Sequence, residues 1–504
     1  MASNDYQRYV SSKQRKRRII RCIIYIVITT ILITLAVITP NYLEKFIKGK
    51  LSAKTILQPD SEGFASWLDP PIHTVRSYYL FNVTNPDEIV TNPSTTKIHV
   101  QDTPPYTYNI KTKKNNVTWS NNNKKLDYEV ERLFTRDKTQ FNPSSVNDTG
   151  VFIDLLRAIF RTTFERKPDP NFYLLGGKNT FRHGNAVEQL EGFTSDLFKI
   201  VRDKMKGPNT DKSGFIYRNN GSRLYNISIK TDLAEKGQVN TFDNELVDFT
   251  ISSPSHYPFP VYDGLTYPPM LFDKPILNIF NSDFCAPVLL QFNNVTKMFG
   301  NILVHEYKIK LIDINNCINS SDTSTCTELD KVDVSKCISS SLPDETIFLS
   351  KAHFYGSNNE TIEKMNIQGF KPNSDKHDST VYFEPYTGTP LEASFRMQLN
   401  IDATIDPMRK SSYGPDLEPT KLRGVKRLVP VFWLDQDIKL SQSMITKLQI
   451  SMFILKHKLY VLIGLALILS IVIIGITECL VKRADKKSRS KRGSYVNADT
   501  LIHH

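Results

Sequence analysis

The stretch "YYLFNVTNPDEI", residues 78–89, shows the pattern on which the fold depends. Large apolar side chains alternate up to Val83, as in a β-strand, and the chain then breaks at Asn85-Pro86. The same stretch holds the sugar-acceptor triplet Asn82-Val83-Thr84, which is modified only in a chain that enters the secretory lumen. The meaning of the triplet therefore depends on the topology of the chain.

Two uncharged apolar segments lie near the ends of the 504-residue chain, "CIIYIVITTILITLAVIT" from residue 22 and "LYVLIGLALILSIVIIGIT" from residue 459. At about 1.5 Å rise per residue, each is long enough to cross a hydrocarbon core of roughly 30 Å. A buried core helix would carry a polar stripe, and these segments hold only scattered Thr and Ser. We therefore predict transmembrane helices over 22–39 and 459–479.

The first segment differs from a cleaved signal peptide. Its apolar run exceeds the usual signal core of about 7 to 15 residues, a basic lead precedes it, and no small-x-small cleavage triplet follows before Pro40. An uncleaved anchor fits these features better.

The basic flanks predict the orientation. Seven Lys or Arg residues lie in 1–21 and seven more in 480–504, against Lys456 and Lys458 on the other side of the second span. By the positive-inside rule both tails are cytoplasmic, and 40–458 forms an extracellular or lumenal domain. Without the fourteen basic and three acidic residues of the tails, 50 basic and 49 acidic residues remain, so the high pI indicates topology and not a nucleic-acid site.

The predicted outer domain carries all the sugar-acceptor triplets and most of the cysteines. The acceptor positions are Asn82, Asn116, Asn147, Asn220, Asn226, Asn294, Asn319 and Asn359. The four outer cysteines are Cys285, Cys317, Cys326 and Cys337, which predict two disulfides with three alternative pairings. Cys22 and Cys479 lie at the spans and are either acylated or small apolar residues.

The outer domain is mostly predicted as strands. Residues 104–134 alternate on both sides of an Asn- and Lys-rich turn, and 392–401 and 427–434 are further strands. Prolines recur from 254 to 275, which favours extended, irregular chain there.

Residues 150–167 differ, because their apolar side chains recur at helical spacing. This pattern predicts a helix whose outer side presents four positive groups, and a weaker helix follows over 185–205. The four groups are Arg157, Arg161, Arg166 and Lys167. They form either a docking patch for anionic ligands or an ordinary solvated face partly balanced by Asp154 and Glu165.

Five motifs follow one another along the outer domain: "YYLFNVTNPDEI", "PPYTYNIKTKKNNVTW", "NSDFC" ending at Cys285, "YFEPYTGTPLEASFRMQLNI" (382–401) and "VPVFWLDQ" (429–436). Together they resemble the class B scavenger receptors, the family of the fatty-acid translocase, the high-density-lipoprotein receptor and the lysosomal integral membrane protein. They occur in the family's order and at similar spacing, and the match also covers both anchors.

The resemblance implies an α+β fold, in which a large antiparallel β-barrel encloses an apolar tunnel and carries a helical apex at about 150–205. It implies a receptor that binds lipids, lipoproteins, anionic ligands or protein partners at the apex and passes lipid to the membrane. A lysosomal or endosomal receptor for protein trafficking or sterol export is the alternative, and an adhesion receptor without transfer is a further one. The resemblance also pairs Cys285 with Cys337 and Cys317 with Cys326.

Three departures from the family pattern are visible. An insertion lies at 167–181, four outer cysteines replace the usual six, and the family's Pro-His-Phe is Ala352-His353-Phe354. The insertion prevents any transfer of ligand specificity from the family, and one bridge should be missing.

Two other function classes fit the sequence poorly. An ecto-enzyme would need phosphate-binding glycine loops with paired acidic residues, and a two-span channel would need polar gating positions within the spans. His305-Glu306 comes nearest to an acid-base or metal pair but has no second histidine four residues on, so we expect a structural role. We expect no enzyme activity, no cofactor, no metal and no nucleic-acid partner.

The predicted location is the plasma membrane, with the endosome or lysosome as the alternative. Leu501-Ile502 resembles a dileucine sorting signal, although Asn497 stands where that signal has an acidic residue. A disordered tail without a signal is the other interpretation.

Overall fold

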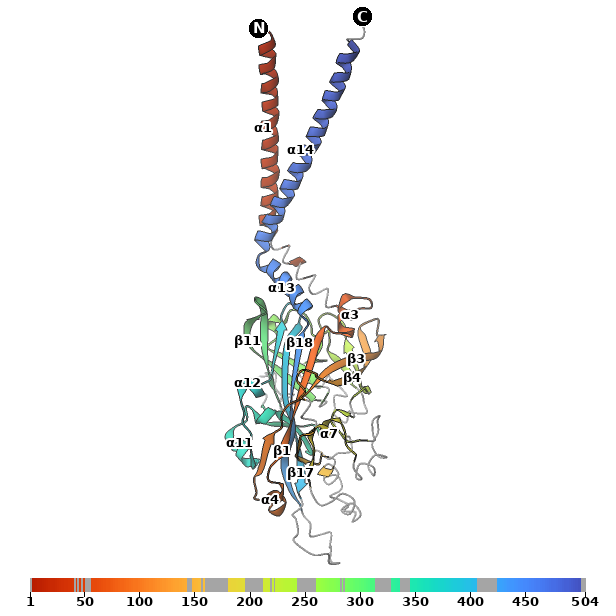
Figure 1. Cartoon of the computed structure of the whole chain (residues 1–504), viewed down its shortest axis with the longest axis vertical. Helices are drawn as coiled ribbons and strands as arrows, with labels where there is room; N and C mark the ends of the chain where they lie inside the picture. Colours follow the sequence, from red (N-terminus) through yellow and green to blue (C-terminus); the bar gives the residue numbers. More distant parts are fainter. Residues whose placement is uncertain are drawn as a thin grey trace, which may run out of the picture. The chain divides into compact units, whose positions relative to one another are not determined.

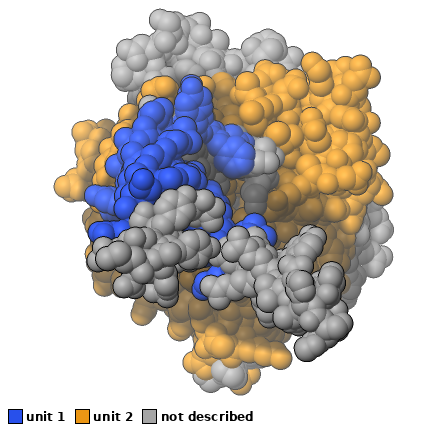
Figure 2. Space-filling model, turned by 90° about the horizontal axis from the view of Figure 1, so that it is seen from above, with its two compact units in different colours: residues 1–50, 447–504 blue, residues 51–446 orange. Residues whose placement is uncertain are grey.

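The computed structural model describes residues 2–499 apart from 40–41, 43–44, 47–48, 50–55, 143–146, 156, 159–179, 195–211, 218–219, 222, 243–259, 282, 284–285, 313–327, 336–344 and 406–423. The chain divides into two compact units, which Figure 1 shows as ribbons and Figure 2 in two colours. One unit comprises Met1–Lys50 with Lys447–His504, and the other comprises Leu51–Thr446.

The first unit is built from two long apolar helices, α1 (Ala2–Ile38) and α14 (Lys458–Asp499). Arg18–Ile38 and Lys458–Arg483 are long and apolar enough to cross a membrane, and their large apolar side chains are mostly exposed, unlike those of a core helix. These helices agree with the predicted spans at 22–39 and 459–479.

The two apolar helices pack against each other through a polar contact. The Tyr25 hydroxyl donates to Glu478 Oε1 at 3.1 Å, and the Thr477 hydroxyl donates to the Tyr25 oxygen at 3.1 Å. Arg21 NH1 lies 3.9 Å from Glu478 Oε1. Glu478 is therefore paired across the helix interface, which stabilises the packing of α1 on α14.

The second unit is dominated by one sheet of sixteen strands among the described residues. They are β1 (Ile72–Val83), β2 (Ile98–Asp102), β3 (Tyr106–Ser120), β4 (Lys125–Arg136), β7 (Arg223–Lys230), β8 (Val239–Phe242), β9 (Val261–Tyr262), β10 (Ile276–Asn281), β11 (Ala286–Met298), β12 (Ile302–Lys310), β13 (Lys331–Asp333), β14 (Ile347–Lys351), β15 (Ile367–Gln368), β16 (Thr380–Glu384), β17 (Thr389–Ile405) and β18 (Val425–Leu440). β5 (Thr149–Ile153) and β6 (Phe181–Asn185) form a separate pair.

The main path of the sheet is β8-β7-β4-β3-β1-β18-β17-β16-β12-β11-β10-β9. Its two edges meet, because Gln238, next to β8, bridges Tyr262 of β9. The sheet is thus a near-closed barrel, in which β1, β17 and β18 run side by side (Figure 1). The predicted α+β class and large barrel are confirmed. The ladders are antiparallel except for the parallel pairs β9–β10 and β2–β15.

Short helices decorate the barrel. They are α3 (Glu62–Leu68), α4 (Pro86–Thr91), α7 (Ala186–Glu191), η5 (Leu271–Asp273), η7 (Ala352–Phe354), α11 (Asn359–Lys364) and α12 (Ser374–His377). The longer helix α13 (Gln442–Lys456) belongs mostly to the first unit. α4 begins at Pro86, directly after the predicted break, because proline suits the first turn of a helix but removes a ladder donor.

The predicted strand positions are confirmed. Residues 104–134 form β3 and β4, and the strands predicted at 392–401 and 427–434 lie within β17 and β18. The hairpin between β3 and β4 turns at Asn121, Asn122 and Asn123, all with positive φ of 50° to 63°. Asparagine tolerates this left-handed conformation better than most residues, which explains the Asn-rich turn.

The helix predicted over 150–167 is wrong at its start. Residues 150–153 belong to β5, where Val151 N donates to Asn82 Oδ1 at 2.8 Å, and the chain becomes helical only at residue 155. Local apolar spacing was overridden by pairing with β6.

The helix predicted over 185–205 does not run unbroken through the described residues. It forms α7 and ends at Glu191, because Gly192 adopts a φ of 111° and Phe193 bridges Ser213 instead. The rest of the predicted helical apex lies outside the described residues.

Gly237 directly precedes the residue that bridges the two edges of the sheet, and its conformation predicts a measurable effect of substitution. Gly237 has a φ of 79°, and a Cβ there would lie 2.1 Å from Thr266 O. We expect Gly237→Ala to lower the free energy of unfolding by more than about 1 kcal/mol, because the position combines positive φ with a backbone clash. Denaturant unfolding would measure it. Gly300→Ala is the control, since Gly300 has a φ of 87° but open space around it. Equal losses in both variants would contradict a role for close approach.

Candidate functional site

The inner face of the barrel carries charged residues in otherwise apolar rows. Along β4 the buried side chains alternate at Leu126, Tyr128, Val130 and Phe134, and Arg132 occupies the place between the last two. Along β1 the same pattern places Arg76 two residues before the buried Tyr78. Period-two alternation puts each arginine on the same face as its buried apolar neighbours.

Arg76 and Arg132 converge on one carboxylate, that of Asp283 in the turn between β10 and β11. Arg76 NH2 lies 2.5 Å from Asp283 Oδ2, and Arg132 pairs with the other oxygen, Oδ1. Arg76 also donates from Nε to Gln436 Oε1 at 2.8 Å and from NH1 to the Tyr78 hydroxyl at 3.2 Å. We call Arg76, Arg132 and Asp283 the inner charge cluster.

The inner charge cluster joins opposite walls of the barrel. Five described strands separate β1 from β10 in either direction around the near-closed sheet. A side chain of β1 can therefore reach a residue next to β10 only across the interior. The contact between Arg76 and Asp283 thus bridges the barrel, and Arg76 is only 5% exposed.

The charges of the cluster stabilise one another. Burial alone would raise the pKa of Asp283, but Arg132 and Arg76 outweigh it and lower this pKa to about 2. Burial opposes the charge of Arg76, yet Asp283 and Tyr78 more than compensate, so its pKa is raised. The cluster therefore stays ionised throughout the physiological pH range, including that of acidic organelles.

A second buried polar cluster surrounds Asp263, next to β9. The Tyr128 hydroxyl lies 3.4 Å from Asp263 Oδ2, and Lys114 donates to the Trp67 carbonyl. Burial lowers the pKa of Lys114 to about 8 and that of Lys236 to about 7, while Asp263 raises both. Burial also raises the pKa of Asp263. These groups titrate closer to neutrality than free lysine and aspartate do.

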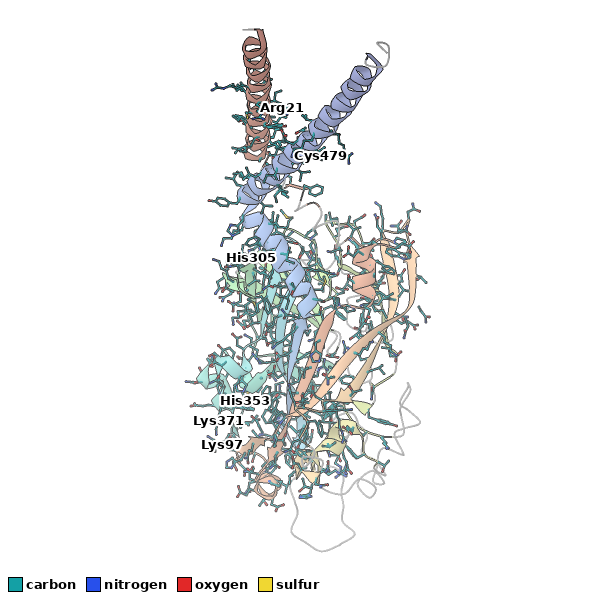
Figure 3. The ribbon with its side chains drawn as sticks, turned by 45° about the horizontal axis from the view of Figure 1, so that its top comes forward. Arg21, Lys97, His305, His353, Lys371 and Cys479 are labelled. Atoms are coloured by element: carbon teal, nitrogen blue, oxygen red, sulfur yellow. The ribbon has the colours of Figure 1, made fainter. Side chains whose placement is uncertain are left out.

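A stacked histidine pair, one residue from η7 and one from α12, packs against the opposite face of β18. The rings of His353 and His377 lie 4.2 Å apart at 14°, and both meet Trp433 edge-on. His353 Nε2 lies 3.0 Å from Asp102 Oδ2, and His353 Nδ1 accepts from Lys371 N at 3.1 Å (Figure 3). His353, in the Ala352-His353-Phe354 variant of the family motif, has a φ of 51°. Both histidines are buried.

The predicted basic patch for anionic ligands lies only partly within the described residues. Arg157 is half-buried, its backbone N–H donates to Asp154 Oδ1 at 3.0 Å, and burial lowers its pKa, with Arg182 acting in the same direction. Arg161, Arg166 and Lys167 lie outside the described residues.

The predicted modification sites fall into three groups. Asn116, Asn147, Asn220, Asn226, Asn294 and Asn359 are exposed, whereas Asn82 is half-buried and bonded to Val151 N. Cys22 and Cys479 are free and exposed on α1 and α14, and Figure 3 labels Cys479. The remaining predicted sites lie outside the described residues: the acceptor Asn319, the four outer cysteines Cys285, Cys317, Cys326 and Cys337, and the sorting residues Leu501 and Ile502.

His305 and Glu306 do not form a joint site. His305 is buried edge-on to the rings of Phe272 and Phe292, whereas Glu306 accepts from Asn293 Nδ2 at 3.1 Å and lies 3.3 Å from Lys308 Nζ. Successive residues of a strand point to opposite faces, which explains the separation. Among the described residues no group of three or more His, Cys, Asp and Glu side chains could hold a metal ion.

The inner charge cluster was not predicted from the sequence. A signal was present, because Arg76 and Arg132 interrupt apolar alternation at positions that should face inward. Asp283 lies within the "NSDFC" motif, but nothing local indicates its partners.

Comparisons with known proteins agree on one family. The model of the CD36 family matches residues 22–481. Lysosome membrane protein 2 of Homo sapiens is 23% identical over 397 residues, covering 76% of this chain and 80% of that protein. Scavenger receptor class B member 1 of Mus musculus is 23% identical over 472 residues, covering 89% and 88%. Sensory neuron membrane protein 1 of Bombyx mori is 28% identical over 200 residues, covering 39% and 35%.

The histidine pair predicts a pH effect on stability. Burial lowers the pKa of His377 to about 4, and the neighbouring His353 contributes to this decrease. The positive charges of Arg396 and Lys376 also lower this pKa, whereas Asp102 raises it. Between about pH 6.5 and 4 the unfolded chain binds a proton that the folded chain does not, so acidification should reduce stability. We expect His377→Gln to flatten this decline in thermal melts at pH 7.5, 6 and 4.5.

The pH dependence of stability in His377→Gln is compared with that of the unsubstituted protein, because titration of Asp435 changes stability in the opposite direction. Burial raises the pKa of Asp435 to about 6, so acidification through pH 6 relieves a buried charge and adds stability. His73→Gln, at an exposed position, is the control. A pH slope in His377→Gln identical to that of the unsubstituted protein would refute the assignment.

Proposed function

The chain belongs to the CD36 family, and from this premise we propose that its outer domain binds lipids or lipoproteins at the apex and passes lipid through the barrel to the bilayer. Family membership makes the chain a membrane receptor rather than an enzyme. The near-closed barrel on a chain with two apolar terminal helices is the observation that carries the proposal, since it supplies an enclosed interior and two anchors.

We further propose the topology that the basic flanks indicate. Residues 1–21 and 480–504 are cytoplasmic tails, 22–39 and 459–479 span the membrane, and 40–458 is the glycosylated outer domain. The two disulfides, Cys285–Cys337 and Cys317–Cys326, and acylation of Cys22 and Cys479 belong to the same proposal.

The plasma membrane is the proposed location, with the lysosome as the alternative. The name of the human relative favours a lysosomal membrane, whereas the mouse relative is a scavenger receptor. A higher level of the protein at the cell surface after Leu501→Ala with Ile502→Ala, seen by imaging, would support the lysosomal location. An unchanged surface level would argue against it.

Transfer is tested with full-length protein in vesicles. Cholesteryl oleate is presented in a lipoprotein-sized emulsion, and its appearance in the vesicle bilayer is followed over time. We expect faster transfer than with protein-free vesicles, because an enclosed path lets the lipid avoid water. Capture of the emulsion without transfer would favour the adhesion receptor, and neither capture nor transfer would contradict the proposed function.

The apex is tested separately by reversing charge. Arg157→Glu with Arg161→Glu should sharply weaken capture of anionic liposomes at low salt, because two attractive groups become repulsive. Capture would be measured by flotation, with neutral liposomes for comparison. Lys97→Glu with Lys371→Glu, outside the proposed patch, is the control for net charge. If the controls match the apex variant, the apex patch is not the docking site.

A further inference from the structure

We propose that one end of the barrel rests in the interface of the bilayer that holds the two apolar helices, and that exposed apolar side chains at this end insert among the lipid head groups. It is the end at which β1 begins and β18 ends. The inference rests on the proposed topology and identifies a surface by which the outer domain contacts the membrane. We call the exposed apolar residues at this end the apolar rim: Leu68, Leu233, Met270, Phe272 and Val295.

Exposed apolar side chains are unevenly distributed over the second unit. Among its described residues, the large apolar side chains that are exposed are those of the apolar rim, at 37% to 51%. The opposite end of the barrel, where α4 lies (Figure 1), presents no exposed side chain of this kind among the residues described there. Single apolar groups scattered over a surface need no explanation, but groups gathered at one end indicate a contact surface.

Leu68 and Leu233 lie at the end of the sheet where Ile72 of β1 pairs with Leu440 of β18. Leu68 is the last residue of α3, four positions before Ile72. Leu233 lies in the turn between β7 and β8. This turn is at the same end, because β3 and β4 run past β1 toward it and β7 pairs with β4.

Met270, Phe272 and Val295 also lie at this end, near the turn between β16 and β17. Met270 N donates to Tyr386 O, in that turn, at 3.3 Å. β17 follows the turn and begins by pairing with the last residues of β18. Val295 is three residues from the end of β11, whose hairpin with β12 turns at this end too.

The segment that presents Met270 and Phe272 has a fixed conformation. Met270 has a φ of 65°, which is unfavourable for a residue with a side chain, and Leu271 N donates to Pro385 O at 2.8 Å. The ring of Phe272 meets that of Tyr386 edge-on, with the centroids 4.8 Å apart. The fold therefore holds both side chains outward, and backbone strain of this kind is found where a binding surface needs it.

The length of the tether identifies the bilayer as the partner. Leu440 and Lys458, at which the second apolar span begins, are 18 positions apart, and 15 of the residues between them form α13. A helix of this length measures about 22 Å. β18 has 16 residues and measures about 53 Å. The chain thus keeps the apolar rim close to the membrane, whereas the opposite end of β18 is much farther from the tether.

The charges beside Leu233 favour a zwitterionic lipid such as phosphatidylcholine. Lys124 Nζ lies 3.7 Å from Asp232 Oδ2, and Lys230 Nζ lies 2.7 Å from Glu235 Oε1. Because these opposite charges are paired, they leave little net charge to attract an anionic surface. Apolar contact therefore provides the attraction, as for other proteins that lie in the membrane interface.

Contact with lipid is tested by fluorescence quenching. Full-length Phe272→Trp and Leu233→Trp proteins are placed in phosphatidylcholine nanodiscs, with or without bromine near the head-group end of the acyl chains. We expect brominated lipid to remove most of the emission that each new tryptophan adds, because interfacial side chains reach about 5–10 Å into the bilayer. The quenching should persist at about 0.5 M salt, since salt screens charges and not apolar contacts.

Ser94→Trp is the matched control. Ser94 is exposed in the turn between α4 and β2, at the opposite end of the barrel, so bromine should not change the emission added there. Equal quenching at Ser94, or no quenching at Phe272 and Leu233, would overturn the inference. Emission at Phe272 that is shielded from water but not quenched by bromine would show that protein covers the apolar rim, which would overturn its contact with lipid.

A second measurement uses the unsubstituted protein and so does not depend on how the variants fold. A phosphatidylcholine with a photoreactive group near its head group is added to the nanodiscs, and labelled peptides are identified by mass spectrometry. Peptides of α1, α14 and the apolar rim should be labelled, and those of α4 should not. Labelling of the two helices without the rim would overturn the inference and leave the proposed topology standing. Labelling of neither would contradict both.

Discussion

The pairing of β1 with β18 is the constraint on which the barrel depends. The ladder runs from Ile72 opposite Leu440 to Leu80 opposite Phe432, and it brings both ends of the outer domain to the same place. The same pairing determines which side chains lie on each face of the sheet. Arg76 contacts Gln436 on one face, and the ring of Tyr79 stacks on that of Trp433 on the other face, with centroids 3.9 Å apart. A slip of one residue would exchange these faces, so the register that forms the inner charge cluster also forms the histidine pair outside.

The inner charge cluster is a poor way to gain stability alone. Removing two guanidiniums and a carboxylate from water is unfavourable, and apolar side chains of similar volume could fill the same space with comparable or better stability. Its neighbours on β1 and β4 are indeed apolar. What the three charges supply is a fixed connection, because Arg76 and Arg132 hold the turn after β10 against β1 and β4 through one carboxylate.

Much of the fold was predictable from local patterns, but the site was not. Leu126, Tyr128 and Val130 alternate, and the Asn turn before them needs left-handed residues, so β3 and β4 follow from neighbouring residues alone. The start of the 150–167 helix was mispredicted because the competing partner, Asn82, lies far away in sequence. The arginines interrupt their apolar rows visibly, but only the near-closed sheet shows that Asp283 faces them from the opposite wall.

The ladder between the first and last strands also has a consequence for biosynthesis. Arg76 and Gln436, which are in contact, are 360 positions apart in the chain. While the ribosome is still making the middle of the protein, β1 has an open edge toward the absent β18, and such edges readily pair with other chains. Folding that waits for a distant partner is slow and exposes the nascent chain to aggregation. The barrel is thus completed only after nearly the whole outer domain has been translated, and until then the edge of β1 that later pairs with β18 stays open.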